Sequence, residues 1–312
     1  MAGLGFRKRQ ELQVNISTPH SRPNGKARTV TWQEVFEWQF DNRYILSGYR
    51  RAKADYLEVF RSLAFLHNES GNVYTHLIGA LLLPLVATTF VQYLARPQYL
   101  NVSSMDYMMF GAYFWCAEIC LALSTLYHLI QPHSHQVEQF WHGMDLLGIL
   151  ILTVGTFSSG IYYVFFCEPS LQILHWIIVS FDYGYSHRFL ISNPLLKIPR
   201  WRKVKVGAFV IFGASSFISL LHGVLRYGLQ YMLQYSGMRW YLLELTFYGS
   251  GVSLYAFRFP KRLAPGKFDI WGSSHQIFHI TILCAMYTHQ TALLQGFITC
   301  HTLDVCQLQG FF

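Results

Sequence analysis

Long runs of apolar residues follow one another along this chain, and they restrict its fold more than any other feature. Seven runs have about the length, near 20 residues, at which an α-helix crosses a bilayer. Continuous apolar runs predict helices, because a membrane β-strand would show a ten-residue alternation that this sequence lacks. The sequence therefore predicts an all-α, polytopic membrane protein with seven transmembrane helices. The runs cover residues 73–94, 107–130, 141–166, 171–191, 205–225, 239–257 and 275–299.

The composition excludes two other classes of protein. Only 13% of the residues are charged and 52% are hydrophobic, whereas a soluble domain carries about 25% charged residues. Aromatic residues make up 17% of the chain, which is unlike the composition of a disordered protein.

The distribution of Lys and Arg predicts the orientation of the chain. Of the 24 Lys and Arg residues, eleven precede the first run, five lie between the fourth and fifth, and four lie between the sixth and seventh. Only three lie in the loops of the other side, and Arg188 lies inside the fourth run. The positive-inside rule then predicts a cytoplasmic N-terminus and a C-terminus outside. The same distribution explains the net charge of +8, so we expect no nucleic-acid partner.

Four regions follow from this pattern. We expect residues 1–30 to be a disordered basic tail, and residues 31–72 to be an amphipathic segment at the membrane surface, where Trp and Tyr side chains sit well. Residues 73–299 would form the transmembrane domain, and residues 300–312 a short extracytoplasmic tail.

The fourth run is the least apolar. Asp182, His187 and Arg188 lie in its second half, and each buried charge costs roughly 2.5–3.5 kcal/mol on an insertion scale. The orientation nevertheless requires a span here, because without it the basic loop at 197–205 would lie outside. Two explanations stay open, a functional polar cavity and a fault in the gene model around residues 180–190.

A few polar residues inside the other runs point to a metal site. Ser124 and His128 lie four residues apart near the end of the second run, and Asp145 lies near the start of the third. His275 and His279, also four apart, begin the seventh run, and such a pair shares one helix face. The predicted orientation brings all five residues to one cytoplasmic level of the membrane.

Three histidines with one open position are typical of catalytic zinc. The sequence therefore predicts Zn²⁺ bound by His128, His275 and His279. The predicted catalytic residues are Asp145, which orients a bound water or accepts its proton, and Ser124, which hydrogen-bonds nearby. A rival cluster in the loop before the third run is better explained by solvated polar residues, and three other histidines by structural or interfacial roles. The rival cluster is His133, His135 and His142, and the other three are His76, His222 and His289.

Several separate motifs resemble the progestin and adipoQ receptor family, also called the haemolysin III-related family, and its fungal members most. The resemblance covers residues 38–306 and rests on WQFDNRYILSGYR (38–50), FLHNESGNVYTHLIG (65–79), STLYH (124–128), MDLLGI (144–149), SNPLLKIPRWRKVKVGAF (192–209) and SSHQIFH (273–279). It implies seven helices, an N-terminus inside, and a zinc ion held by the three histidines named above, with Asp145 holding the zinc-bound water.

The resemblance also implies two functions. The first is hydrolysis of a lipid amide such as ceramide, with a related lipid or a free fatty acid as bound partner, linked to lipid and zinc homeostasis. The alternative is a receptor in which zinc is structural and an extracellular ligand shifts the helices. A metal or proton transporter ranks last, because it needs polar groups at several depths and the sequence shows one polar layer besides the doubtful fourth run. Both the plasma membrane and the endoplasmic reticulum are compatible with the sequence, which does not indicate an oligomeric state.

Overall fold

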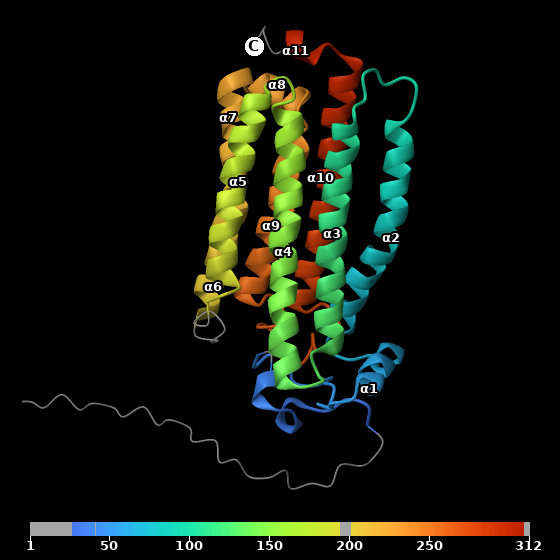
Figure 1. The fold of residues 1–312 in the computed structure, drawn as a ribbon. Coiled ribbons are helices and arrows are strands. Elements are labelled where there is room, and N and C mark those ends of the chain that lie inside the picture. Colours follow the sequence, from blue (N-terminus) through green and yellow to red (C-terminus); the bar gives the residue numbers. More distant parts are fainter. Residues whose placement is uncertain (1–26, 41, 194–200, 309–312) are drawn as a thin grey trace, which may run out of the picture.

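The structure, a computed structural model, describes residues 27–40, 42–193 and 201–308. Within these ranges the regular structure is helical, with one isolated bridge between Val30 and Tyr49. The long helices run side by side in an elongated bundle, with α1 at one end and α11 at the other (Figure 1). The prediction of an all-α protein is confirmed for the described residues.

Every predicted run lies almost entirely in helix. The long helices are α2 (Ser70–Leu94), α3 (Ser104–Ile130), α4 (His135–Val164), α5 (Pro169–Leu190), α6 (Arg202–Ala214), α7 (Ser216–Tyr227), α9 (Met238–Phe257) and α10 (Ser274–Thr302). The short elements are η1 (Trp32–Glu34), η2 (Glu37–Gln39), α1 (Tyr56–Arg61), η3 (Ser62–Ala64), α8 (Leu229–Gln234) and α11 (Val305–Leu308). The fifth run is divided between α6 and α7 at Ser215, which itself keeps right-handed helical backbone angles.

Five segments of the described chain are long and apolar enough to cross a membrane. They are α2, α3, α4, α10 and the α6–α7 pair taken together. Helices α5 and α9 do not reach that measure, although α5 packs against α4 and α6, and α9 packs against α10 and α6.

The polar half of α5 is accommodated in two ways. The hydroxyl of Ser215, at the junction of α6 and α7, donates a hydrogen bond of 2.6 Å to the carboxylate of Asp182. His187 and Arg188 lie in the last turn of α5, where Arg188 is exposed. The one carboxylate of this half therefore has a partner on a neighbouring helix.

Small residues allow α3 and α4 to approach closely. A side chain at Gly155 would place its Cβ 2.6 Å from the Cβ of Cys116, and one at Gly148 would lie 3.1 Å from the Cα of Cys120. Membrane helices commonly pack through such small residues, because lipid gives no hydrophobic drive for association. This packing places Asp145, on α4, beside the C-terminal half of α3.

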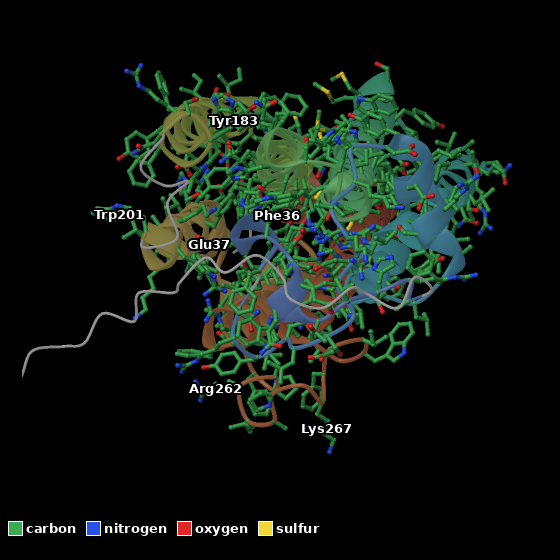
Figure 2. All side chains as sticks on the ribbon, turned by 90° about the horizontal axis from the view of Figure 1, so that it is seen from below. Phe36, Glu37, Tyr183, Trp201, Arg262 and Lys267 are labelled. Atoms are coloured by element: carbon green, nitrogen blue, oxygen red, sulfur yellow. A yellow bond between two sulfur atoms is a disulfide. The ribbon has the colours of Figure 1, made fainter. Side chains whose placement is uncertain are left out.

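The α1 end of the bundle is covered by the N-terminal segment. Phe36 and Glu37 lie across this end when the molecule is viewed along the bundle (Figure 2). The segment is anchored by Asp269, whose carboxylate accepts hydrogen bonds from the Leu46 amide (3.0 Å) and the Ser47 hydroxyl (2.7 Å). Of the tail predicted to be disordered, residues 1–26 lie outside the described residues.

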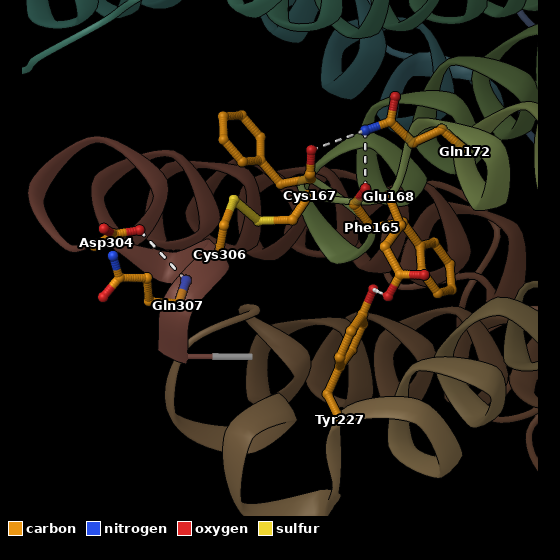
Figure 3. Close-up of a disulfide and its surroundings, with 9 residues drawn as sticks. Phe165, Cys167, Glu168, Gln172, Tyr227, Asp304, Cys306 and Gln307 are labelled. Atoms are coloured by element: carbon orange, nitrogen blue, oxygen red, sulfur yellow. Dashed lines mark hydrogen bonds between the residues drawn. A yellow bond between two sulfur atoms is a disulfide. The ribbon is translucent and has the colours of Figure 1, made fainter. Parts of the chain in front are cut away.

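The α11 end carries a disulfide that the sequence analysis did not anticipate. Cys167, directly after α4, is bonded to Cys306 in α11, 139 residues later (Figure 3). The Tyr227 hydroxyl donates a 2.9 Å hydrogen bond to Glu168 nearby, and the Gln172 amide donates one of 2.9 Å to the Phe165 carbonyl. These bonds hold together the ends of α4, α5, α7 and the C-terminal segment.

Candidate metal centre

Three predicted ligands meet near the α1 end of the bundle. His128 lies in the last turn of α3, and His275 and His279 lie in the first two turns of α10. One ring nitrogen from each lies within 4.8 Å of the others, a spacing that one metal ion can bridge. The prediction that these three histidines come together is confirmed.

His128 is oriented by a carboxylate that the sequence analysis did not select. Its Nδ1 lies 2.8 Å from Oε2 of Glu69, the residue before α2, and a carboxylate can only accept, so Nδ1 donates. Its Nε2 is buried and has no hydrogen-bond partner among the described residues. A buried, unpartnered imidazole nitrogen is costly unless something binds it, and a metal ion among the three rings would do so.

Glu69 is itself held in place. The Asn72 amide donates a 2.6 Å hydrogen bond to the same oxygen. Burial opposes ionisation of Glu69, but the hydrogen bonds from His128 and Asn72 and the nearby imidazoles outweigh it, so its pKa lies below the ordinary value. Glu69 is therefore a carboxylate at neutral pH and fixes the tautomer of His128.

His279 is oriented in the same manner by main chain. Its Nδ1 donates to the Asn72 carbonyl at 3.2 Å, which leaves Nε2 for a metal. The ring of His76 stacks on His279, with centroids 3.8 Å apart and planes 13° from parallel. Metal-binding histidines usually donate their second ring N–H to a carboxylate or a carbonyl, and His128 and His279 both do so here.

The starts of α2 and α10 must be very close for this arrangement. Gln276 donates hydrogen bonds to the carbonyls of Ile270 (2.8 Å) and Asn68 (3.3 Å). A side chain at Gly71 would lie 2.5 Å from the Gln276 side chain, so a larger residue here would displace Gln276. The contact brings Glu69 and Asn72 to the histidines of α10.

A buried arginine fixes the end of α3 that carries His128. Arg50 donates to the carbonyls of His128 (2.6 Å) and Leu129 (2.7 Å), and to the Ser62 hydroxyl (2.9 Å). Burial lowers the pKa of Arg50 to about 10, so it stays charged at neutral pH. A cation at the last carbonyls of a helix is favourable.

Asp145 and Ser124 lie beside the histidines. Both line the cavity that His128, His275 and His279 also line. Asp145 does not belong to the group of possible ligands. This placement suits a residue that acts on a bound water rather than on the metal, although the roles of Asp145 and Ser124 stay predictions.

The cavity extends from the histidines into the bundle. Its volume is about 1350 Å³, and most of its wall is apolar side chains from α4, α6, α7 and α9, with Glu37 and Trp38 at the α1 end. A cavity of this size and lining can hold a lipid-like molecule with its polar part at the histidines.

The rival histidines near the start of α4 do not converge. His133 stacks on Tyr56 with centroids 4.1 Å apart, and His135 stacks on Trp38 at 5.6 Å. His142 lies 3.1 Å from the Tyr127 hydroxyl. No metal-ligand group other than the three histidines occurs in the part of the chain that the structure describes.

Sequence reasoning missed partners for three histidines that it assigned to structure. His76 stacks on His279, His222 lies 2.9 Å from Nε2 of His175, and His289 lies 2.9 Å from Glu244. Local spacing could not reveal these pairs, since each joins two different helices. The one available signal for His76 was its place in the motif FLHNESGNVYTHLIG, which also contains Glu69 and Asn72.

Comparison with known proteins decides the family. The model of the haemolysin-III-related family matches residues 65–290, which include all three histidines, Asp145 and Ser124. The chain belongs to this family. The predicted resemblance to this family is thus confirmed, and the similar proteins include fungal members.

Curated relatives of this family cover most of the chain. It is 35% identical to the ADIPOR-like receptor IZH2 of Saccharomyces cerevisiae over 88% of its own length and 86% of the relative's. It is 31% identical to the ADIPOR-like receptor IZH1 of Eremothecium gossypii, over 94% of each chain. The Drosophila melanogaster adiponectin receptor protein is 32% identical over 83% of this chain, which spans 57% of that relative. With its apolar helices, this membership identifies the chain as an integral membrane protein.

Proposed function

We propose that the chain crosses the membrane seven times, with the α1 end in the cytoplasm and the α11 end outside. Helices α5 and α9 lie within the same bundle as the five apolar segments (Figure 1), which supports counting them as spans. The disulfide at the α11 end supports the orientation, because disulfides persist in oxidising compartments. Tags at the two termini test it in intact cells. A C-terminal tag protected from external protease, with an exposed N-terminal tag, would overturn the proposed orientation.

The metal we propose is zinc, held by His128, His275 and His279. Three imidazoles with a fourth position open suit Zn²⁺, and the unpartnered Nε2 of His128 supports a bound ion at that point. Elemental analysis of the purified protein should find one zinc per chain, and His275→Ala should lose it. His133→Ala is the matched control and should keep it. Loss of metal in the control alone would move the site to the start of α4.

The activity we propose is hydrolysis of a lipid amide of the ceramide type. The observation that carries it is one apolar cavity containing both the histidine cluster and Asp145. When bound, zinc would supply Lewis-acid activation of water and of the amide carbonyl. Asp145 would accept a proton from the attacking water as the C–O bond forms, and deliver it to the amide nitrogen as the C–N bond breaks. Ser124, which lines the same cavity, would hydrogen-bond to the carboxyl of Asp145 and hold it in position.

Product release by purified protein tests this activity. Wild type with zinc should convert ceramide to fatty acid and sphingoid base, measured by mass spectrometry, and His275→Ala should not. His133→Ala should retain the activity. Zinc-loaded wild type that cleaves none of a panel of ceramides would contradict the hydrolase proposal.

A receptor with structural zinc is the second candidate. It is favoured by the names of the relatives, which include ADIPOR-like receptors and an adiponectin receptor protein. The three histidines would then lock α3 to α10, and a ligand would shift those helices. This function predicts that His275→Ala abolishes signalling while wild type shows no lipid turnover.

A further inference from the structure

A second polar cluster lies deeper in the bundle. Nδ1 of His289 on α10 donates to Oε2 of Glu244 on α9 at 2.9 Å, and Nε2 of His289 lies 3.3 Å from the hydroxyl of Ser159 on α4. All three side chains are buried. His289 follows His279 by ten residues, which places this cluster about 15 Å farther along α10 at 1.5 Å per residue. The prediction of a single polar layer is therefore wrong.

The contacts Ser159–His289–Glu244 resemble the catalytic triad of a hydrolase, but the serine is not placed to attack a substrate. The Ser159 hydroxyl lies 2.8 Å from the Gly155 carbonyl and donates to it. Ser159 is fully buried and does not line the cavity, whereas Glu244 and His289 do. The single proton of Ser159 goes to Gly155, so Ser159 only packs beside His289, and the faces open to a ligand belong to His289 and Glu244.

Tyr241 adds a hydroxyl that has no partner. It lies three residues before Glu244 on the same face of α9, and its ring centroid is 5.5 Å from that of His289. The residue is 6% exposed, and its hydroxyl is buried without a hydrogen-bond partner among the described residues. Tyr241 also lines the cavity. A buried, unsatisfied hydroxyl is unfavourable, so this one calls for a group supplied from the cavity.

The chemistry of the three side chains defines that group. The Glu244 carboxylate only accepts hydrogen bonds, so the ligand must donate to it; the Tyr241 hydroxyl can donate, so the ligand can also accept. An anionic group would be repelled by Glu244. A neutral hydroxyl donates and accepts at once, and it costs less to bring into an apolar cavity than an ion does.

We propose that Tyr241, Glu244 and His289 form a binding point for a hydroxyl group on the hydrocarbon chain of a lipid whose amide or carboxyl group lies at the histidine cluster. The spacing sets the position of that hydroxyl. An extended chain advances about 1.1–1.2 Å per bond, so about 15 Å corresponds to roughly a dozen bonds. This inference rests on the proposed function in that it takes the polar end of the lipid to lie at the three histidines.

The test compares lipids that differ only in the presence and position of one hydroxyl on the acyl chain. The probes are N-acyl sphingosines with a plain C18 chain, a 12-hydroxy C18 chain or a 2-hydroxy C18 chain, together with the three matching free fatty acids. Wild type should prefer the 12-hydroxy lipid over the other two by about ten- to a hundredfold, the usual contribution of a hydrogen bond to a charged group. Tyr241→Phe and Glu244→Gln should lose the preference and bind the plain lipid as wild type does. Tyr162→Phe, at a buried tyrosine that does not line the cavity, should keep it.

Two measurements separate this inference from the hydrolase proposal. Binding of the free acids, followed as a shift in thermal stability of the zinc-loaded protein, needs no turnover, whereas KM for the amides does. A 12-hydroxy preference in binding with no hydrolysis would refute the hydrolase proposal and support the binding point. Equal binding of all three acids by wild type, or an unchanged preference in both variants, would overturn the inference.

Discussion

Replacement of Glu69 by Gln tests whether the metal affinity depends on a residue that binds no metal itself. In wild type the carboxylate accepts the Nδ1–H of His128 at 2.8 Å and is also held by Asn72 at 2.6 Å. Gln keeps the size but offers one acceptor oxygen and no charge, so the His128 ring would be held less firmly and its Nε2 would be a weaker ligand. Loss of such a partner typically reduces metal affinity about 10- to 100-fold, which is about 1.4–2.7 kcal/mol.

The assay is a competition titration of the purified protein with a zinc chelator. Glu69→Gln should release zinc at a chelator activity about 10- to 100-fold lower than wild type does. The matched control is Glu58→Gln, at a partly exposed glutamate at the same end of the molecule that pairs with Lys53 and Arg61. If Glu69→Gln and Glu58→Gln retain zinc equally, the argument that Glu69 orients His128 is refuted.

Three further predictions concern turnover, acid stability and the disulfide. Asp145→Asn should keep its zinc and lower amide hydrolysis by about 10²–10⁴-fold; loss of zinc with turnover would make Asp145 a ligand instead. Burial, and after it the charge of Arg50, lowers the pKa of His67 to about 3 despite the nearby Glu69, so the folded state favours neutral His67. The free energy of unfolding should therefore fall as the pH drops from about 6.5 toward 3. The melting temperature of His67→Gln should fall less between pH 7 and pH 5 than that of wild type. Removal of the disulfide should lower the free energy of unfolding by about 2–4 kcal/mol. The melting temperature should therefore fall by the same amount in Cys167→Ser, in Cys306→Ser and in the double variant. Unequal melting temperatures would mean that the bond does not form.

Much of this fold could be predicted because its helices are determined by local sequence. An apolar run of about 20 residues has no alternative to a helix in lipid, so the predicted ranges agree closely with α2 to α10. The histidine cluster was predictable for a related reason. His275 and His279 share a face through helix periodicity alone, and the alternation of membrane sides brought His128 to the same level.

The sequence left the partners of these residues undetermined. Glu69, Asn72 and His76 reach the histidines only because α2 packs against α10 through Gly71 and Gln276. Likewise the pair of Glu244 with His289, and the disulfide between Cys167 and Cys306, join positions that are far apart in the chain.

The division between the features that the sequence predicts and those that only the tertiary structure shows has a physical cause. Hydrophobic length and helix periodicity act within one segment and leave a visible pattern in its residues. Hydrogen bonds between helices depend on the rotation and approach of both partners, which the packing of all the helices determines together. The sequence by itself therefore determined the apolar helices and the three metal-binding candidates. Only the tertiary structure decided which carboxylate orients each imidazole and that a second polar cluster faces the same cavity.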